Sequence, residues 1–127
     1  MNNGKILVMD DENEIRYIFT KMLNRMQYEV ETAVDGYKAL ELFKSAIEIK
    51  KPFEAVIIDL EVANGMGGEE TIRRLLEIDP GTKIILSSGS ISDHIMNDFK
   101  KYGIRAVLRK PFKNDELKKV LRKVISE

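Results

Sequence analysis

Short runs of apolar residues alternate along this chain with longer segments in which apolar residues recur every three or four positions. A short apolar run is typical of a buried strand, and a repeat of about 3.6 residues is typical of a helix with one apolar face. The apolar runs predict strands near residues 5–9, 29–33, 54–59, 83–87 and 105–109. Because a helical segment follows each strand, we expect a (βα)5 doubly wound α/β fold with a parallel sheet.

The apolar stripes also outline the helices. The first stripe contains six residues: Ile15, Ile18, Phe19, Met22, Leu23 and Met26. Further helices are predicted over about residues 36–49 and 68–78. The second of the five helices should end before Pro52, since proline disfavours helical geometry in the residue before it.

The last two helices are predicted from their ends as well as from their stripes. The fourth would be capped by Ser92 or Asp93 and would end before Gly103. Its inward residues would be Ile95, Met96 and Phe99. Asn114 is expected to cap the fifth helix, because asparagine is a favoured N-cap residue.

Length and composition narrow the class of protein. The 127 residues suffice for one domain, over 1–127, with one core. Lys and Arg number 21, as do Asp and Glu, so there is no basic excess for binding nucleic acid. Cysteine is absent, which excludes disulfides and thiolate metal sites. No stretch approaches the roughly 18 apolar residues of a membrane span, and no signal peptide fits before the first strand, so we expect a cytoplasmic protein that binds no membrane.

Polar residues stand where several of the apolar runs end. Asp10 and Asp11 follow the first strand, Asp59 ends the third, Ser87 and Ser88 follow the fourth, and Lys110 follows the fifth. In an open α/β sheet, ligands bind outside the carboxyl ends of the strands. In the flavodoxin-like strand order 2-1-3-4-5 the first and third strands are neighbours, so we expect the three carboxylates to converge.

This set of residues indicates phosphoryl chemistry that depends on a metal ion. Neighbouring carboxylates repel one another, and a hard cation such as Mg²⁺ or Mn²⁺ relieves that repulsion. Lys110 and Ser88 could bind the oxygens of a phosphoryl group. Asp59 is the expected nucleophile and would form an aspartyl phosphate. The loop at residues 64–68 offers backbone N–H groups, although its glycines lack the spacing of nucleotide-binding motifs.

The chain resembles the receiver domain of two-component response regulators over essentially its whole length. The segments that carry this resemblance are residues 6–12, 56–60, 84–89 and 110–112. The resemblance implies that Asp59 accepts a phosphoryl group from a sensor histidine kinase or a phosphotransfer protein. It also implies Mg²⁺ ligation by Asp11, by Asp10 largely through water, by Asp59 and by the main-chain carbonyl of Glu61.

The resemblance further assigns Ser88 as the switch hydroxyl, Lys110 as the conserved-type lysine and the peptide before Pro111 as a cis peptide. The chain also departs from the family pattern. The loop after Asp59 is one residue longer than in many receivers, as in the receivers of hybrid histidine kinases, and Ala63 replaces a common proline, so we expect a more mobile loop. Val107 stands where an aromatic residue is common, and Glu61 adds a carboxylate that we expect to alter the lifetime of the phosphoryl group.

Other interpretations stay open from the sequence. A Mg²⁺-dependent phosphohydrolase could also form an aspartyl phosphate, but Asp59-Leu60-Glu61 is a poor match to the Asp-x-Asp such enzymes use. A docking module that is never phosphorylated would be expected to lack one of the key residues. Ser87 is expected to satisfy backbone groups and His94 to be exposed. The chain could be a free-standing receiver or part of a larger regulator, and its downstream partner is unknown.

Overall fold

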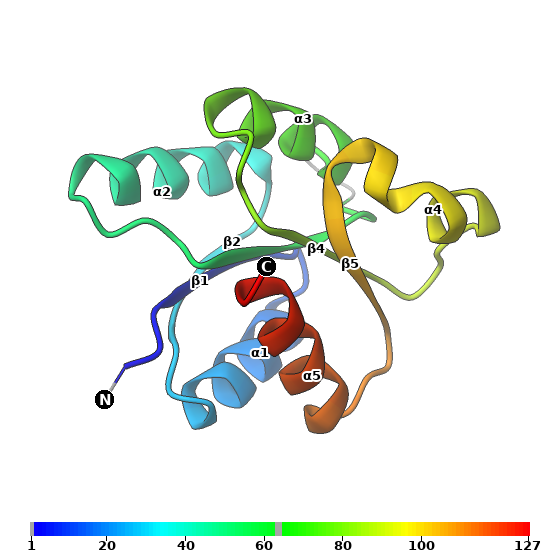
Figure 1. The fold of residues 1–127 in the computed structure, drawn as a ribbon, viewed down its shortest axis with the longest axis horizontal. Coiled ribbons are helices and arrows are strands. Elements are labelled where there is room, and N and C mark those ends of the chain that lie inside the picture. The colour runs from blue at the N-terminus through cyan, green and yellow to red at the C-terminus, as the bar shows by residue number, and fades with distance from the viewer. Residues whose placement is uncertain (1, 63–64) are drawn as a thin grey trace.

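Five parallel strands form one sheet in this protein, for which the computed structural model describes residues 2–62 and 65–127. The strands are β1 (Lys5–Met9), β2 (Glu29–Ala33), β3 (Ala55–Asp59), β4 (Ile84–Ser88) and β5 (Ile104–Arg109). Their spatial order is β2-β1-β3-β4-β5, so the predicted order and the doubly wound flavodoxin-like class are confirmed (Figure 1). The central strands β1 and β3 are direct neighbours, which brings their carboxyl ends together.

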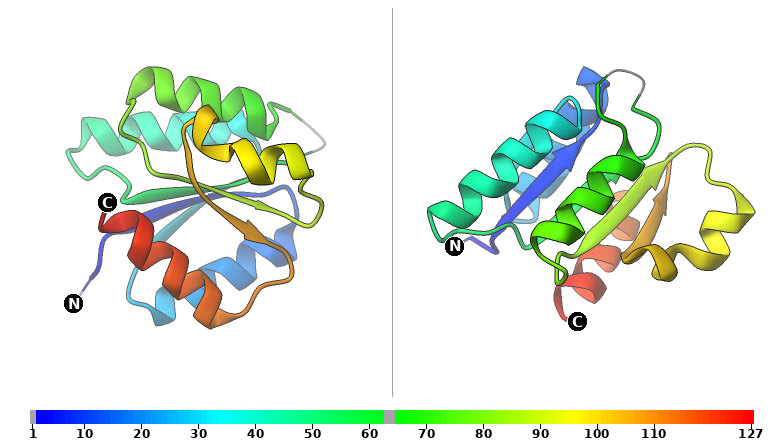
Figure 2. Two further views of the ribbon diagram at one scale, coloured as in Figure 1. Left: turned by 45° about the vertical axis from the view of Figure 1, so that its right-hand side comes forward. Right: turned by 90° about the horizontal axis from the view of Figure 1, so that it is seen from above.

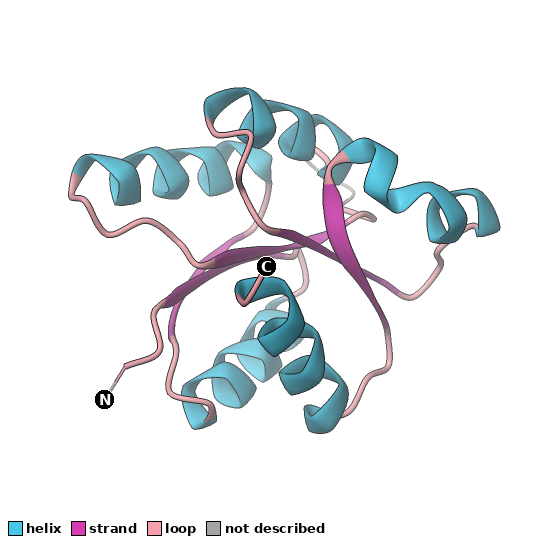
Figure 3. Ribbon diagram, in the orientation of Figure 1, coloured by secondary structure: helices cyan, strands magenta, loops and turns pink. Residues whose placement is uncertain are grey.

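The helices form a layer on each face of the sheet. They are α1 (Asn13–Arg25), α2 (Gly36–Glu48), α3 (Gly68–Ile78), α4 (Asp93–Asp98) and α5 (Asn114–Ile125), and α4 continues as a 3₁₀ segment, η1 (Phe99–Tyr102). Helices α1 and α5 cover one face, and α2, α3 and α4 cover the other (Figures 2 and 3). Within the described residues, no helix combines the length and the apolar character that crossing a bilayer requires.

Two apolar cores lie between these layers, because successive strand residues point to opposite faces. On β1, Leu7 and Met9 face the core under α2 and α3, whereas Ile6 and Val8 face the core under α1 and α5. Every residue of β3 and β4 is buried. This explains why these strands read as continuous apolar runs instead of alternating patterns.

Some predicted inward residues are exposed. Ile18 lies at the margin of the α1 stripe and is 46% exposed, because the buried face of that helix is centred on Phe19 and Leu23. Met96 is 37% exposed, since α4 has only six residues before the chain changes to 3₁₀ geometry and its period shifts. Both predictions of burial were therefore wrong.

The predicted helix ends are correct to within about one residue. Ser92 caps α4, because its side chain accepts a hydrogen bond from the Ile95 N–H. At α5, however, the N-cap residue is Lys113, and Asn114 is already helical. The Lys113 N–H donates to Glu116 Oε1 at 3.3 Å, so the glutamate satisfies the backbone N–H of the cap residue.

Candidate functional site

The predicted site residues meet at the carboxyl edge of the sheet. Asp10 directly follows β1, Asp59 and Ser88 are the last residues of β3 and β4, and Lys110 directly follows β5. Asp10 and Asp59 are almost fully buried, with 1% and 4% of their surface exposed. Asp10, Asp11 and Asp59 each place one carboxylate oxygen within 4.8 Å of the others. The parallel topology therefore gathers three acids from two strand ends into one cluster.

The ammonium group of Lys110 lies against this cluster. Its Nζ is 2.8 Å from Asp10 Oδ2 and 3.7 Å from Asp59 Oδ2. The Lys110 side chain is 18% exposed, so this ion pair is shielded far better than a surface pair. The Lys110 ammonium group therefore places a positive charge against two of the three carboxylates, those of Asp10 and Asp59.

Backbone amides hold the two buried carboxylates in the same way. The Glu12 N–H donates to Asp10 Oδ1 at 2.9 Å, and the Glu61 N–H donates to Asp59 Oδ1 at 3.0 Å. In addition, Arg16 Nη1 donates to the Asp10 carbonyl oxygen at 2.7 Å. The sequence analysis missed Arg16, and its place on the first turns of α1, beside Asp10, was the only available signal.

Burial and neighbouring charges shift the pKa values of Asp59 and Lys110. Burial raises the pKa of Asp59 above its usual value, the hydrogen bond from the Glu61 amide and the charge of Lys110 act in the opposite direction, and the charges of Asp10 and Glu61 raise it further. For Lys110, burial by itself lowers the pKa, but the hydrogen bond to Asp10 and the charges of Asp10, Asp59 and Glu12 raise it overall. The lysine is therefore firmly cationic, while Asp59 is a carboxylate whose charge is incompletely compensated.

Ser88 has a partner that the sequence did not indicate. Its Oγ is fully buried and donates a hydrogen bond to Glu61 Oε1 at 2.6 Å. The same Oγ accepts a hydrogen bond from the Ser90 N–H at 3.1 Å. The expectations for Glu61 concern its main-chain carbonyl and its negative charge, whereas the structure places its carboxylate on the hydroxyl of Ser88.

Comparison with known proteins agrees with this geometry. A family model for the response regulator receiver domain matches residues 6–122. The chain belongs to this family. Sporulation initiation phosphotransferase F of Bacillus subtilis is 28% identical to it over 125 residues, which cover 98% of this chain and 96% of that protein. The response regulator TrrA of Thermotoga maritima, solved in complex with Mg²⁺-BeF, is 31% identical with a TM-score of 0.80, and the match covers 95% of this chain and 98% of that one.

Receiver domains of this kind occur in proteins of very different length. The present domain spans 96% of the chemotaxis protein CheY of Thermotoga maritima, to which it is 27% identical over 94% of its own length. In contrast, it spans only 15% of the transcription factor SKN7 of Chaetomium thermophilum, to which it is 27% identical over 94% of its own length. The family is thus established for the domain, and the activities of the longer relatives are not transferred with it.

Several further expectations can be compared with the structure of this receiver domain. The peptide between Lys110 and Pro111 is cis, as the resemblance implied. Ser87 is 1% exposed, and its Oγ has no hydrogen-bond partner among the described residues, so the expectation that it satisfies backbone groups was wrong. As the residue before Ser88, it points to the opposite face of the sheet.

His94 is exposed, as expected, and contacts Tyr102 and Asp98. Ala63 and the start of the glycine loop, Asn64, lie outside the described residues.

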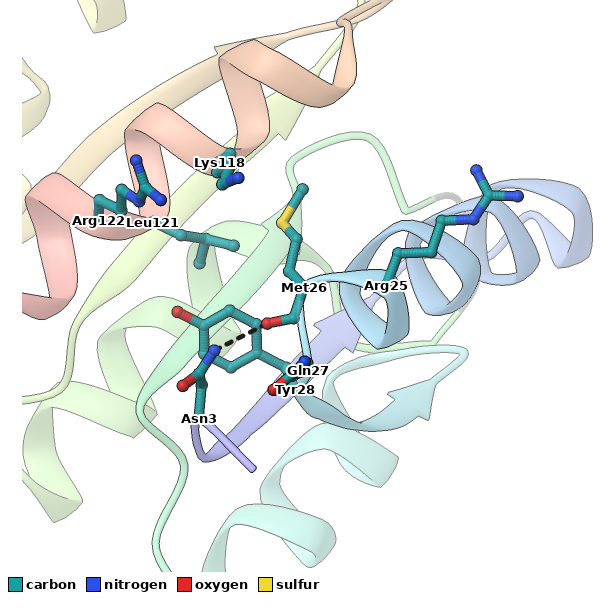
Figure 4. A pocket seen from close by; sticks show the side chains of 8 residues that line it. All are labelled: Asn3, Arg25, Met26, Gln27, Tyr28, Lys118, Leu121 and Arg122. Carbon is teal, nitrogen blue, oxygen red and sulfur yellow. Dashed lines mark hydrogen bonds between the residues drawn. The ribbon is translucent and has the colours of Figure 1, made fainter. Parts of the chain in front are cut away.

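A surface hollow of about 350 Å³ lies at the other end of the receiver domain. It is lined by the end of α1, the segment between α1 and β2, and one side of α5, and the Tyr28 ring lies among its lining residues (Figure 4). Asn3 Nδ2 closes one side by donating to the Met26 carbonyl oxygen at 2.8 Å. Because α1 begins beside Asp10 and runs away from it to Arg25, this hollow is remote from the acidic cluster. Its lining holds cations and amides but no carboxylate, so it is not the site predicted from the sequence.

Proposed function

We propose that this receiver domain accepts a phosphoryl group on Asp59 in a Mg²⁺-dependent reaction. The observation that carries the proposal is the position of Lys110, whose ammonium group lies between the buried carboxylates of Asp10 and Asp59. A phosphoryl group bound to Asp59 would lie close to the ammonium group of Lys110 and to an acidic cluster that can hold a metal. Positioning and charge neutralisation of this kind are what phosphoryl transfer requires from a protein.

The donor atoms of the cluster fit a hard divalent cation. Asp10, Asp11 and Asp59 supply carboxylate oxygens only, which favours Mg²⁺ or Mn²⁺ over zinc. In the proposed site the main-chain carbonyl of Glu61 is a further ligand. When bound, the cation neutralises the acidic cluster and the oxygens of the incoming phosphoryl group. The closeness of these three oxygens, which lie within 4.8 Å of one another, supports this assignment.

In the proposed reaction, a carboxylate oxygen of Asp59 attacks the phosphorus atom of a phosphohistidine or of a small donor such as acetyl phosphate. The new O–P bond forms as the bond from phosphorus to the donor breaks, and the bonding electron pair leaves with the donor. Lys110 and Ser88 then donate hydrogen bonds to the phosphoryl oxygens. The raised pKa of Lys110 keeps its ammonium group protonated through this step.

The proposed donors are a sensor histidine kinase or a phosphotransfer protein, and the downstream partner is a protein that distinguishes the two states. Similarity to the sensor kinase/phosphatase LuxQ of Vibrio vulnificus, 28% identical over 89% of this chain and 13% of that protein, supports such a signalling setting. Phosphorylation adds about −1.5 to −2 charges and shifts the population between two conformations. The domain would thus act in the cytoplasm as a regulated phosphoacceptor instead of a multiple-turnover enzyme. No observation favours the phosphohydrolase or the unphosphorylated docking module.

Incubation with acetyl phosphate and Mg²⁺, followed by intact mass measurement, tests the proposal. We expect the wild type to gain the mass of one phosphoryl group and Asp59→Asn to gain none, with a chelator abolishing the gain in the wild type. Glu69→Ala, a change of one exposed acid in the first turn of α3, serves as a control that should still be phosphorylated. A gain of mass in Asp59→Asn, or no gain in the wild type with any phosphohistidine donor, would contradict it.

A further inference from the structure

Glu61 and Ser88 form a hydrogen bond that joins the segment following β3 to the last residue of β4. Glu61 is exposed and lies two residues beyond Asp59, whereas Ser88 is fully buried at the end of β4. Their side chains meet at 2.6 Å, with the Ser88 hydroxyl as the donor and Glu61 Oε1 as the acceptor. The buried hydroxyl of Ser88 therefore donates its hydrogen to the carboxylate of an exposed residue, Glu61.

The Ser88 hydroxyl carries one hydrogen, so it can donate to one acceptor at a time. Its oxygen is already used as an acceptor by the Ser90 N–H, which fixes the position of Oγ. Ser88 can therefore donate to a phosphoryl oxygen only after Glu61 has released the hydroxyl.

We propose that Glu61 is an internal competitor of the phosphoryl group for Ser88. Its carboxylate occupies the hydroxyl in the unphosphorylated domain and must withdraw into solvent when the phosphoryl group binds. The proposal rests on the proposed function, because it takes Asp59 as the acceptor. In this role Glu61 Oε1 accepts the hydrogen of Ser88 Oγ, so Glu61 acts through Ser88 and is a positioning residue, not a catalytic one.

Two features favour competition over a merely structural contact. The Glu61 main-chain N–H is bonded to Asp59 Oδ1, so the competing side chain begins beside the acceptor carboxylate itself. In addition, Glu61 is exposed, so its carboxylate can return to water without leaving a buried charge behind. The same withdrawal would break the link between the segment after β3 and the end of β4, at a site where Val107 provides no aromatic side chain to move.

Binding of beryllofluoride in the presence of Mg²⁺ provides the test, because this phosphoryl analogue needs no donor. We expect Glu61→Ala to bind the analogue about tenfold more tightly than the wild type, the size of one hydrogen bond to a charged group. Glu61→Gln keeps an acceptor but loses the charge, so an intermediate gain is expected. Glu69→Ala removes a nearby exposed acid that does not contact Ser88, and it should leave the affinity within about twofold.

The Ser88→Ala background separates competition from charge repulsion. If Glu61 acts through Ser88, Glu61→Ala should gain at most about twofold once the hydroxyl is gone. An equal gain in both backgrounds would show that Glu61 acts by charge alone and would overturn the proposal. The absence of any gain in Glu61→Ala would overturn it as well.

Urea unfolding of the metal-free protein checks the resting contact independently of phosphoryl chemistry. The losses of stability in Glu61→Ala and Ser88→Ala should not be additive in the double variant, because both remove the same bond. Additive losses would overturn the proposal whatever the ligand data show. If no variant binds beryllofluoride or phosphate while the unfolding losses are non-additive, the proposed function is wrong and the Glu61–Ser88 contact still stands.

Discussion

The segments that follow β3 and β4 border the same site, yet they are held in place very differently. After β3, Gly68 begins the eleven-residue helix α3 and packs against the end of the strand, where an added Cβ would lie 2.8 Å from the Asp59 carbonyl oxygen. After β4, an added Cβ on Gly89 would meet no heavy atom within 4 Å among the described residues. The helix that follows, α4, has six residues.

This difference separates the parts of the site that are fixed from the parts that can adjust. Asp59 is held by close backbone packing, by the Glu61 amide and by the charge of Lys110. Ser88 is also buried, but an added Cβ on the next residue, Gly89, would meet no described heavy atom within 4 Å, and the Ser88 hydroxyl bonds to a side chain that extends from solvent. The carboxylate of Asp59 is thus held by three separate contacts, while the hydroxyl of Ser88 bonds to an exposed side chain.

Removal of Lys110 should have the largest effect on the fixed part. Lys110→Met leaves Asp10 buried without its cation, and breaking a buried pair from one side costs about 3 kcal/mol. We expect a loss of that size in the free energy of unfolding, measured with urea in the absence of metal. The control is Lys44→Met, which removes an exposed lysine on α2 and should change stability by less than about 0.5 kcal/mol. Equal effects of the two changes would show that the ammonium group is not part of a buried pair.

The two glycines provide a matched pair. Gly68→Ala forces backbone atoms apart at the end of β3, so we expect a loss of about 2 kcal/mol. Gly89→Ala enters open space and should stay within about 0.5 kcal/mol of the wild type. Thermal unfolding of both variants measures the difference. If Gly89→Ala were the more damaging change, the contrast between the two segments would be wrong.

The smallest expected effect concerns pH. Because burial raises the pKa of Asp59, the folded protein holds a proton there more readily than the unfolded chain does. The stability this contributes is fully present below the ordinary pKa of 3.8 and is lost as the pH rises through the folded-state pKa. Asp59→Asn cannot lose that proton, so without metal it should exceed the wild type in stability at neutral pH by up to about 1 kcal/mol.

A comparison of the wild type and Asp59→Asn at two pH values provides the control for this prediction. Unfolding by urea at neutral pH and at a pH below 3.8 should show the advantage of Asp59→Asn shrinking on acidification. An Asp59→Asn protein that is less stable than the wild type at neutral pH would mean that the carboxylate is well compensated by Lys110. In that case the site would be fixed by charge pairing more than by packing.

Much of the fold followed from the sequence because strand burial and helix periodicity are local signals. The apolar runs located the five strands to within a residue, and the polar residues at their ends located the cluster, since a parallel sheet brings those ends to one edge. Side-chain direction was harder to predict. Ile18 fits a helical stripe, but only the position of the sheet decides that it lies at the margin of that stripe.

The contacts that were missed involve long or flexible side chains. The place of Arg16 on the first turns of α1 indicates only that it lies near Asp10. No spacing reveals the bond from Ser88 to Glu61, because these partners lie on different elements. Val107 could be identified as a departure from the family pattern, but nothing in the sequence indicated that a carboxylate would already occupy the hydroxyl of Ser88. Such contacts depend on the rotamer of a side chain in three dimensions.

The register between β3 and β4 determines which side chains meet at the carboxyl edge of the sheet. Asp59 is paired with Ser87, so the hydroxyl that meets Glu61 belongs to the following residue. Removing one residue from β4 would move every later side chain to the other layer and would turn the hydroxyl of Ser88 away from Glu61. A one-residue deletion in β4, with every acidic residue kept, would therefore be enough to remove the bond between the end of β4 and the segment after β3.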